Sequence, residues 1–210
     1  MVCRTRLNVR YSMRNSSNSA STVRHCIDFI AQDPTLLSYL LFSSLRSDHA
    51  GEIGAVWVYK GILKGSTDPE VREFAKRHLV VETHHLELMG SLLNRSQHSY
   101  LLPLWRAAGF LIGYIPALLG PRAVFVVIEA VETFVEDHYE DQIIYLQKSE
   151  LQSPSSHHLL LTLKHCLEGE KEHKHDAQAR LMYQSILLDR LVQRLVYGGS
   201  TLAVSIARRL

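Results

Sequence analysis

The sequence predicts an all-α fold, and three observations lead to that prediction. Apolar residues recur at spacings of three and four along four successive segments, which is the period of a helix with one buried face. Proline and glycine fall at the ends of these segments, where helices begin and stop. No segment shows the strict alternation of a half-buried strand. With 210 residues, the chain is long enough for one domain with a substantial core.

Four long helices follow from these boundaries. Gly65 is well placed to end the first, and Asp68 to cap the second, with Pro69 in its first turn. A final segment, 189–210, has a helical composition but contains Gly198-Gly199, which we expect to interrupt it. The expected spans of the four long helices are 34–65, 69–94, 121–149 and 154–188.

Two Glu-x-x-His motifs lie in the second and fourth of these helices, Glu82 to His85 and Glu170 to His173. Residues three apart share a helix face, so each motif can offer a carboxylate and an imidazole to one metal ion. Both motifs lie on apolar stripes, and burying a carboxylate costs several kcal/mol unless a partner neutralises it. A bound metal would be such a partner, although one motif of this kind alone is weak evidence.

The first and third helices each add an acid on an apolar stripe, Glu52 and Glu132. The order is then Glu, Glu-x-x-His, Glu, Glu-x-x-His, which is the ligand arrangement of ferritin-like di-iron carboxylate bundles. The sequence therefore predicts a ferritin-like four-helix bundle whose two halves repeat each other. Periodicity alone leaves Glu129 and Glu136, one turn either side of Glu132, open as alternative ligands.

The predicted site contains four glutamates, whose negative charges would balance two divalent cations. Carboxylate and imidazole groups suit iron or manganese, and the lack of cysteine in the pattern argues against structural zinc. We expect two glutamates to be terminal ligands, two to bridge, and one imidazole to bind each ion. The expected set is Glu52 and Glu132 as terminal ligands, Glu82 and Glu170 as bridges, and the imidazoles of His85 and His173.

Neighbouring residues have less specific predictions. Tyr59 and Tyr139 lie two turns from Glu52 and Glu132 on the same stripes, and we expect core aromatics that can reach a substrate or the ligands. His49 and His138 are candidates for residues that contact the metal ligands rather than the metal itself. Solvent-facing positions are expected for His84, Glu87, Glu172 and His175, and a buried apolar position for Cys166.

The chain begins with a segment of different composition. Residues 1–27 contain five arginines and several serines but no Lys, Asp or Glu, as in a mitochondrial transit peptide. A disordered leader is the alternative. We therefore expect a leader over 1–30 and a ferritin-like di-iron domain over 33–210. Nothing in the rest of the chain indicates a nucleic-acid surface, and the three cysteines form no disulfide or zinc pattern.

An almost wholly apolar stretch, 101–119, separates the second and third helices, and no charge falls between Arg106 and Arg122. Its glycines and Pro116 should interrupt it, which leaves an apolar run shorter than the ~20 residues that span a bilayer. Three interpretations remain: a buried core helix, an oligomer interface, or a helix lying in the membrane interface. Trp105 and the flanking arginines favour the last.

Several short motifs occur together in this chain. They are Asp48-His49-Ala50-Gly51-Glu52 with Tyr59, Glu82-x-x-His85, Pro103-Leu104-Trp105 with Gly109-Phe110, Ala130-Val131-Glu132 with His138-Tyr139 and Gln142-Ile143, and Glu170-x-x-His173 with His175-Asp176-Ala177. In combination they resemble the 5-demethoxyubiquinone hydroxylase family of ubiquinone biosynthesis, over about residues 40–210. The resemblance selects Glu132 over Glu129 and Glu136. Crowded acids on the fourth helix and a short deletion after His173 leave the ligand register open there.

The resemblance implies a membrane-associated di-iron monooxygenase on the matrix side of the inner mitochondrial membrane. The family hydroxylates the quinone ring of a demethoxyubiquinone with dioxygen and electrons from NADH, and a lipid-binding partner protein presents the polyprenyl substrate. It implies that 101–119 faces the membrane and that His138 and Tyr139 lie near the quinone site, for substrate positioning or electron transfer. A homo-oligomer is a further expectation. The sequence contains no Gly-rich dinucleotide fingerprint, so no motif supports NADH binding.

Other functions fit parts of the pattern. A quinol oxidase of the same bundle class would share the ligands and differ in its product. A ferritin-like iron-handling protein would need a hydrophilic exterior, which the apolar 101–119 stretch opposes. A non-catalytic helical scaffold with vestigial acids would bind no iron.

Overall fold

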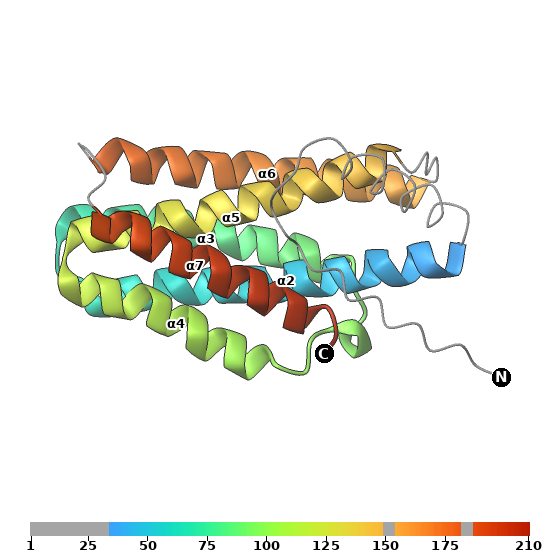
Figure 1. Ribbon diagram of the computed structural model, residues 1–210, viewed down its shortest axis with the longest axis horizontal. Helices are drawn as coiled ribbons and strands as arrows, with labels where there is room; N and C mark the ends of the chain where they lie inside the picture. The colour runs from blue at the N-terminus through green and yellow to red at the C-terminus, as the bar shows by residue number, and fades with distance from the viewer. Residues whose placement is uncertain (1–33, 149–153, 182–186) are drawn as a thin grey trace. The chain divides into compact units, whose positions relative to one another are not determined.

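The computed structural model describes residues 34–148, 154–181 and 187–210. The chain divides into two units, Met1–Leu37 and Ser38–Leu210, and the architecture below is that of the second. The leader expected over 1–30 lies outside the described residues. The elements are α2 (Pro34–Gly65), α3 (Pro69–Ser91), the 3₁₀ helix η1 (Arg95–Gln97), α4 (Leu102–Leu119), α5 (Pro121–Lys148), α6 (Pro154–Arg180) and α7 (Leu187–Ala207) (Figure 1).

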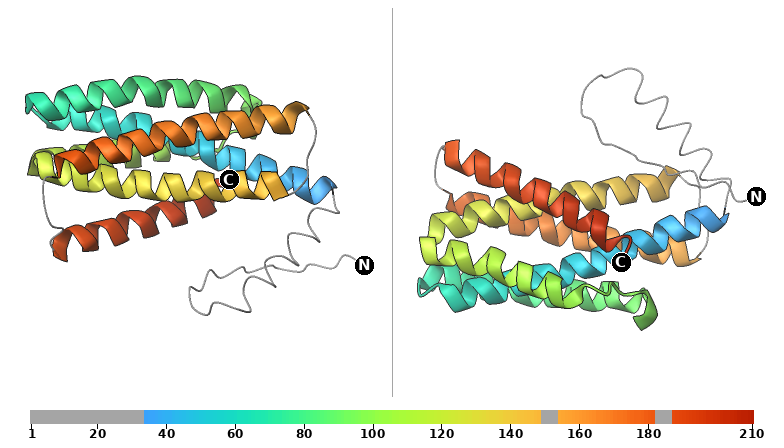
Figure 2. Two further views of the ribbon diagram at one scale, coloured as in Figure 1. Left: turned by 90° about the horizontal axis from the view of Figure 1, so that it is seen from above. Right: turned by 60° about the horizontal axis from the view of Figure 1, so that its bottom comes forward.

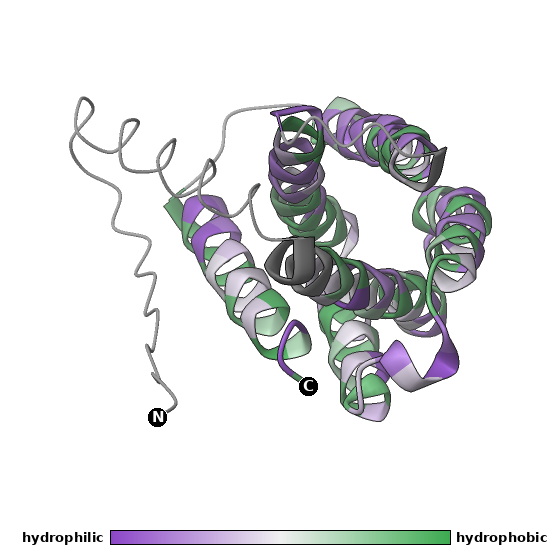
Figure 3. Ribbon diagram, turned by 90° about the vertical axis from the view of Figure 1, so that its right-hand side faces the viewer, coloured by the Kyte–Doolittle hydropathy of each residue, from purple (hydrophilic) through white to green (hydrophobic). Residues whose placement is uncertain are grey.

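The all-α prediction is confirmed, because every regular element in these ranges is a helix. Four helices, α2, α3, α5 and α6, surround a common interior, as in a ferritin-like bundle, and α4 and α7 lie outside it (Figure 3). α6 packs extensively on α5, and both outer helices also pack on α5. α7 packs on α5 at an angle, on the outside of the bundle (Figures 1 and 2).

The bundle core consists of two apolar clusters, and every bundle helix passes from one to the other. One cluster is built around Tyr59, Phe74 and Ile128, and the other around Met89, Tyr139 and Leu163. The buried acids and histidines of each helix fall between its contributions to the two clusters. The polar residues therefore form a layer inside the core, with apolar packing above and below.

The helix boundaries agree with expectation at the start of the domain and differ toward its end. Asp68 caps α3 as predicted, since its carboxylate accepts a hydrogen bond of 3.0 Å from the Val71 backbone N–H. α3 ends at Ser91 rather than near Asn94. α6 ends at Arg180, whose side chain turns back to the Asp176 backbone carbonyl, so the expected end at 188 is wrong; residues 182–186 of the expected extension lie outside the described residues. Leu187 and Leu188, the last residues of the expected fourth helix, instead begin α7, which packs on α5.

The expected interruptions of α4 and α7 by glycine are also wrong, because both helices continue through them. A Cβ at Gly109 would lie 2.2 Å from the Gly54 carbonyl oxygen, and one at Gly113 would lie 1.9 Å from that of Val58. The α4 glycines therefore let its backbone touch the backbone of α2, which compensates for their low helix propensity. Pro116 sits one turn before the end of α4.

Only Gly109, Gly113 and Ala117 of α4 are buried, and most of its large aliphatic side chains are exposed. The exposed ones are Leu104, Leu111, Ile112, Ile115, Leu118 and Leu119. By length and composition α4 could cross a membrane, and it is the one helix of the described residues that could; 17% of it is buried. A buried core helix is therefore excluded for this segment. The apolar extra helix that the sequence predicts between the second and third bundle helices is present.

α7 packs on α5 through polar contacts while its leucines face outward. Arg122 pairs with Asp189, the Gln193 amide donates to Glu129 at 3.0 Å, and the Tyr197 hydroxyl donates to Asp137 at 3.0 Å. The apolar side chains exposed on α7 are Leu187, Leu188, Leu191, Leu195 and Leu202. The C-terminal end is fixed by the Tyr100 N–H, which donates to the Leu210 carbonyl at 2.8 Å. Both outer helices thus present apolar surface on the outside.

The backbone contact between α4 and α2 predicts opposite effects for one substitution at two helical glycines. Gly113→Ala should lower the free energy of unfolding by about 1–3 kcal/mol, because its methyl group collides with the Val58 carbonyl. Gly198→Ala on α7 should raise it by up to about 1 kcal/mol, because no described atom lies within 4 Å of its Cβ. Urea denaturation of both variants measures the difference. Equal effects would contradict the close approach of the two helices.

Candidate metal centre

Six acidic and histidine side chains from four helices meet in the polar layer of the core. Their residues are Glu52 of α2, Glu82 and His85 of α3, Glu132 of α5, and Glu170 and His173 of α6, each between 0% and 3% exposed. These are the six residues that the Glu, Glu-x-x-His repeat selects. No charged group is ordinarily buried this deeply without compensation.

The six side chains form two overlapping groups. In one, ligand atoms of Glu52, Glu82, His85 and Glu170 all lie within 4.8 Å of one another. In the other, the same holds for Glu82, Glu132, Glu170 and His173. Glu82 and Glu170 belong to both groups, so the geometry matches two adjacent cations that share two carboxylates.

Both imidazoles turn Nδ1 toward the carboxylates. His85 Nδ1 lies 3.2 Å from Glu170 Oε1 and 4.0 Å from one oxygen each of Glu52 and Glu82. His173 Nδ1 lies 2.9 Å from Glu82 Oε1 and 3.4 Å from Glu170 Oε2. The three-residue spacing of each motif places its carboxylate and imidazole on the same helix face, and the antiparallel partner helix supplies the other pair.

Electrostatics in this layer are dominated by burial. Burial, reinforced by the Glu170 carboxylate, raises the pKa of Glu82 and Glu132 well above the ordinary range and that of Glu52 to about 7. Burial acts in the same direction on Glu170, but the neighbouring imidazoles of His173 and His85 outweigh it and lower the pKa of Glu170 to about 2. The pKa of His85 rises to about 9 because the surrounding carboxylates outweigh its burial. Burial therefore favours the neutral form of Glu52, Glu82 and Glu132, and cations bound here would stabilise their charged form instead.

The residues present fit a pair of divalent cations. Both oxygens of Glu82, one of Glu52 and both ring nitrogens of His173 make no hydrogen bond of acceptable geometry among the described residues, although His173 Nδ1 is close to Glu82 Oε1. Unpaired buried atoms of this kind are rare, and here the residues that carry them all belong to the two groups described above. Carboxylate and imidazole donors are the set that iron and manganese accept.

Two tyrosines cross the layer and bond the glutamates from the opposite helix. The Tyr59 hydroxyl of α2 donates to Glu132 Oε1 of α5 at 3.1 Å, and the Tyr139 hydroxyl of α5 donates to Glu52 Oε1 of α2. Each tyrosine is seven residues after the glutamate of its own helix. Each tyrosine hydroxyl therefore bonds the glutamate of the opposite helix rather than the glutamate of its own helix. This hydrogen bond orients the carboxylate that accepts it.

The geometry of this layer agrees with a comparison to known families. The family model of ubiquinone biosynthesis protein COQ7 matches residues 40–207, which is most of the chain. The chain belongs to the COQ7 family.

Named members of the family align over most of this chain. A Dictyostelium discoideum protein named NADPH-dependent 3-demethoxyubiquinone 3-hydroxylase, mitochondrial, is 31% identical over 181 residues, which cover 81% of this chain and 80% of the relative. The Saccharomyces cerevisiae protein named 5-demethoxyubiquinone hydroxylase, mitochondrial, is 31% identical over 160 residues, with 68% and 69% covered. The Rhodospirillum rubrum 3-demethoxyubiquinol 3-hydroxylase is 35% identical over 127 residues, with 59% of each chain covered.

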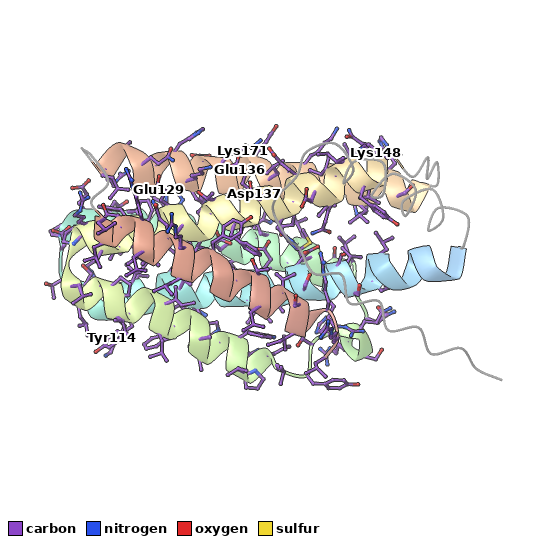
Figure 4. The ribbon with its side chains drawn as sticks, in the orientation of Figure 1. Tyr114, Glu129, Glu136, Asp137, Lys148 and Lys171 are labelled. Atoms are coloured by element: carbon purple, nitrogen blue, oxygen red, sulfur yellow. The ribbon has the colours of Figure 1, made fainter. Side chains whose placement is uncertain are left out.

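The alternatives to Glu132 lie outside the candidate metal centre. Glu129 accepts hydrogen bonds from Gln178 and Gln193. Glu136 pairs with Lys174 at 2.6 Å and lies beside Lys171, between α5 and α6 (Figure 4). The predictions of exposed positions are confirmed for His84, Glu87, Glu172 and His175, and that of a buried position for Cys166.

His138 and His49 occupy different surroundings. His138 Nε2 lies 2.9 Å from Asp48 Oδ1, an oxygen that also accepts a hydrogen bond from Gln142. The ring of His138 also lies beside that of Tyr139, the residue whose hydroxyl donates to Glu52. His49 instead stacks on His98, with 4.0 Å between ring centroids. These contacts are to Asp48, Tyr139 and His98, and none is to one of the six central side chains.

Sequence reasoning missed three supporting residues. Asp48 holds His138, and Asp176 accepts from His78 at 2.8 Å, while the His78 ring packs edge-on against His173 at 4.3 Å. Asp48 and Asp176 both lie within motifs of the family resemblance, and His78 is on the stripe of Glu82, but neither signal specifies the partner. Their pairings link helices distant in the sequence.

The crossed tyrosines predict a stability cost that depends on the hydroxyl group alone. Tyr59→Phe and Tyr139→Phe should each lower the free energy of unfolding by about 1–3 kcal/mol, because a buried carboxyl oxygen loses its donor. Tyr145→Phe is the matched control on α5, since the Tyr145 hydroxyl is buried without a partner among the described residues. That variant should be neutral or slightly stabilised. Chemical denaturation distinguishes the three, and a cost at Tyr145 equal to the others would contradict this account.

Proposed function

We propose that this chain is a di-iron monooxygenase that hydroxylates the quinone ring of a demethoxyubiquinone in ubiquinone biosynthesis. The observation that carries the proposal is the pair of buried groups sharing Glu82 and Glu170, within a chain of the COQ7 family. Relatives named for demethoxyubiquinone hydroxylation support the reaction class. Dioxygen would be the second substrate.

In this proposal six residues hold two irons. Glu52 and His85 would serve one ion, Glu132 and His173 the other, and Glu82 and Glu170 would bridge. When bound, a carboxylate-bridged pair of irons supplies the electrons that dioxygen activation requires. The protein would hold these ligands in a fixed arrangement and exclude water from them. Tyr59 and Tyr139 orient the terminal carboxylates, and the apolar clusters on both sides exclude water.

His138 and Tyr139 are the proposed catalytic residues, for quinone positioning or electron transfer. Tyr139 touches Glu52, and His138, half-buried beside it, is held by Asp48. The electron donor of the proposal is a reduced nicotinamide nucleotide, NADH in the family resemblance. The names of several mitochondrial relatives specify NADPH, so an assay should compare the two nucleotides.

A membrane surface, formed by α4 and α7, belongs to the same proposal. The outward leucines of both helices would lie against the acyl region and give the polyprenyl quinone a path into the protein. Relatives named as mitochondrial support that compartment, and we place the chain on the matrix side of the inner membrane, with a transit peptide in residues 1–30. A lipid-binding partner protein and a homo-oligomer would use the same apolar faces.

Iron binding is the first expected outcome of this proposal. Anaerobic titration of the chelator-treated protein with Fe²⁺ should give two ions per chain and a rise in melting temperature, because ligand binding stabilises the folded state. Glu82→Ala and Glu170→Ala should lose most of this binding, because each removes a carboxylate shared by both ions. A scaffold with vestigial acids would bind no iron and would be stabilised by Glu82→Ala.

Incorporation of labelled oxygen tests the reaction. The iron-loaded protein is incubated with a demethoxyubiquinone, NADH or NADPH and isotopically labelled dioxygen, and the product mass is measured. A gain of one labelled oxygen atom, lost in Glu82→Ala and Glu170→Ala, is the expected result. Consumption of reductant and dioxygen with unchanged quinone would indicate an oxidase. No consumption by protein that holds two irons would reject the hydroxylase proposal.

Vesicle binding tests the membrane surface. Leu111→Lys combined with Leu118→Lys should reduce sedimentation with liposomes of inner-membrane lipid composition at least about tenfold, because two charges enter the apolar region. Leu161→Lys, at an equally exposed leucine on α6, should leave binding unchanged. Equal loss in both variants, or none in the first, would reject α4 as the contact.

A further inference from the structure

Two exposed histidines meet on the outer surface where α3 and α6 come together. His84 of α3 and His165 of α6 are both exposed, and their rings lie edge to face with 5.8 Å between centroids. Two imidazoles on one cation lie at a comparable separation, because each nitrogen is about 2 Å from the metal. Neither residue belongs to the six that form the metal centre.

The pair continues inward as a series of imidazole rings. His165 lies edge-on to buried His85, with 6.1 Å between centroids, and His85 stacks on His173 at 6.2 Å. Exposure falls along the series from the two surface rings to 1% at His85 and His173. A row of nitrogen ligands thus connects solvent to both groups of the metal centre.

A cation needs such a route because the centre itself is closed. None of its six residues is more than 3% exposed. α6 packs closely on α5 but has few close backbone contacts with α3, so side chains fill much of the contact between α3 and α6. At this contact α6 presents Gly169, whose position leaves the His85 ring directly against the α6 backbone; a Cβ there would lie 2.6 Å from His85 Cε1.

We propose that His84 and His165 form a surface capture site for Fe²⁺ and pass the ion to His85. Neutral imidazole binds divalent transition metals, and an exposed pair can exchange its ion quickly because it lacks the carboxylates that hold metal in the interior. The transfer exchanges one imidazole ligand for another and changes no oxidation state. This inference rests on the proposed function only in that the interior centre holds iron.

The rate at which iron enters the protein tests the capture site. Chelator-treated protein is mixed anaerobically with Fe²⁺ below saturation, quenched at intervals with a strong chelator, and assayed for protein-bound iron. His84→Ala combined with His165→Ala should slow incorporation about tenfold, because Fe²⁺ then has no pair of surface nitrogen ligands from which to reach His85. The final content should still reach that of the unaltered protein, since all six interior residues remain.

The control removes two exposed histidines of α6 that lie away from the contact with His84. His157→Ala combined with His158→Ala should load at the unaltered rate. Equal rates for both double variants overturn the capture site, whereas failure of the unaltered protein to bind iron would reject the proposed metal centre instead. If the alanine variant does not fold by circular dichroism, His84→Gln with His165→Gln retains side-chain size without an imidazole, and the same comparison applies.

Discussion

Burial of four carboxylates at one level of the core is the constraint on which the rest of this structure depends. Glu52, Glu82, Glu132 and Glu170 together would destabilise an apolar core by far more than the free energy that ordinarily holds a domain folded. Two imidazoles, two crossing tyrosine hydroxyls and the cations of the proposed function offset that cost. Apolar clusters on either side keep the layer dry, which strengthens each of these interactions.

The layer is built twice from one pattern. In each half, an acid-bearing helix is followed by a helix with Glu-x-x-His, and the acid-bearing helix places a tyrosine seven residues after its glutamate. Each tyrosine serves the glutamate of the other half. The halves therefore depend on each other for their supporting hydrogen bonds. The outer His–Asp pairs, His78 with Asp176 and His138 with Asp48, extend the mutual support beyond the six central residues.

The outer helices α4 and α7 expose most of their large aliphatic side chains, whereas the bundle helices bury many of theirs in the core. α4 buries glycine and alanine and exposes leucine and isoleucine, and α7 uses Asp189, Gln193 and Tyr197 to pack on α5 while its leucines stay outside. A soluble domain would gain stability from the reverse arrangement. In the proposed function this apolar surface meets the membrane that carries the substrate. The surface that carries His84 of α3 and His165 of α6 would remain in water, where Fe²⁺ is available.

The sequence by itself determined the helical class, the start of α3 and the residues of the buried layer, because helix periodicity is local and the order of acids and histidines repeats. It also placed an apolar helix between 101 and 119. Only the tertiary structure decided that Gly109, Gly113 and the Gly198-Gly199 pair continue their helices, since packing against α2 and α5 outweighs propensity. The crossing tyrosines, the Asp48–His138 pair and the contact of His84 with His165 join residues 73 to 90 positions apart. No local pattern encodes such pairings, because they arise from how the helices face one another.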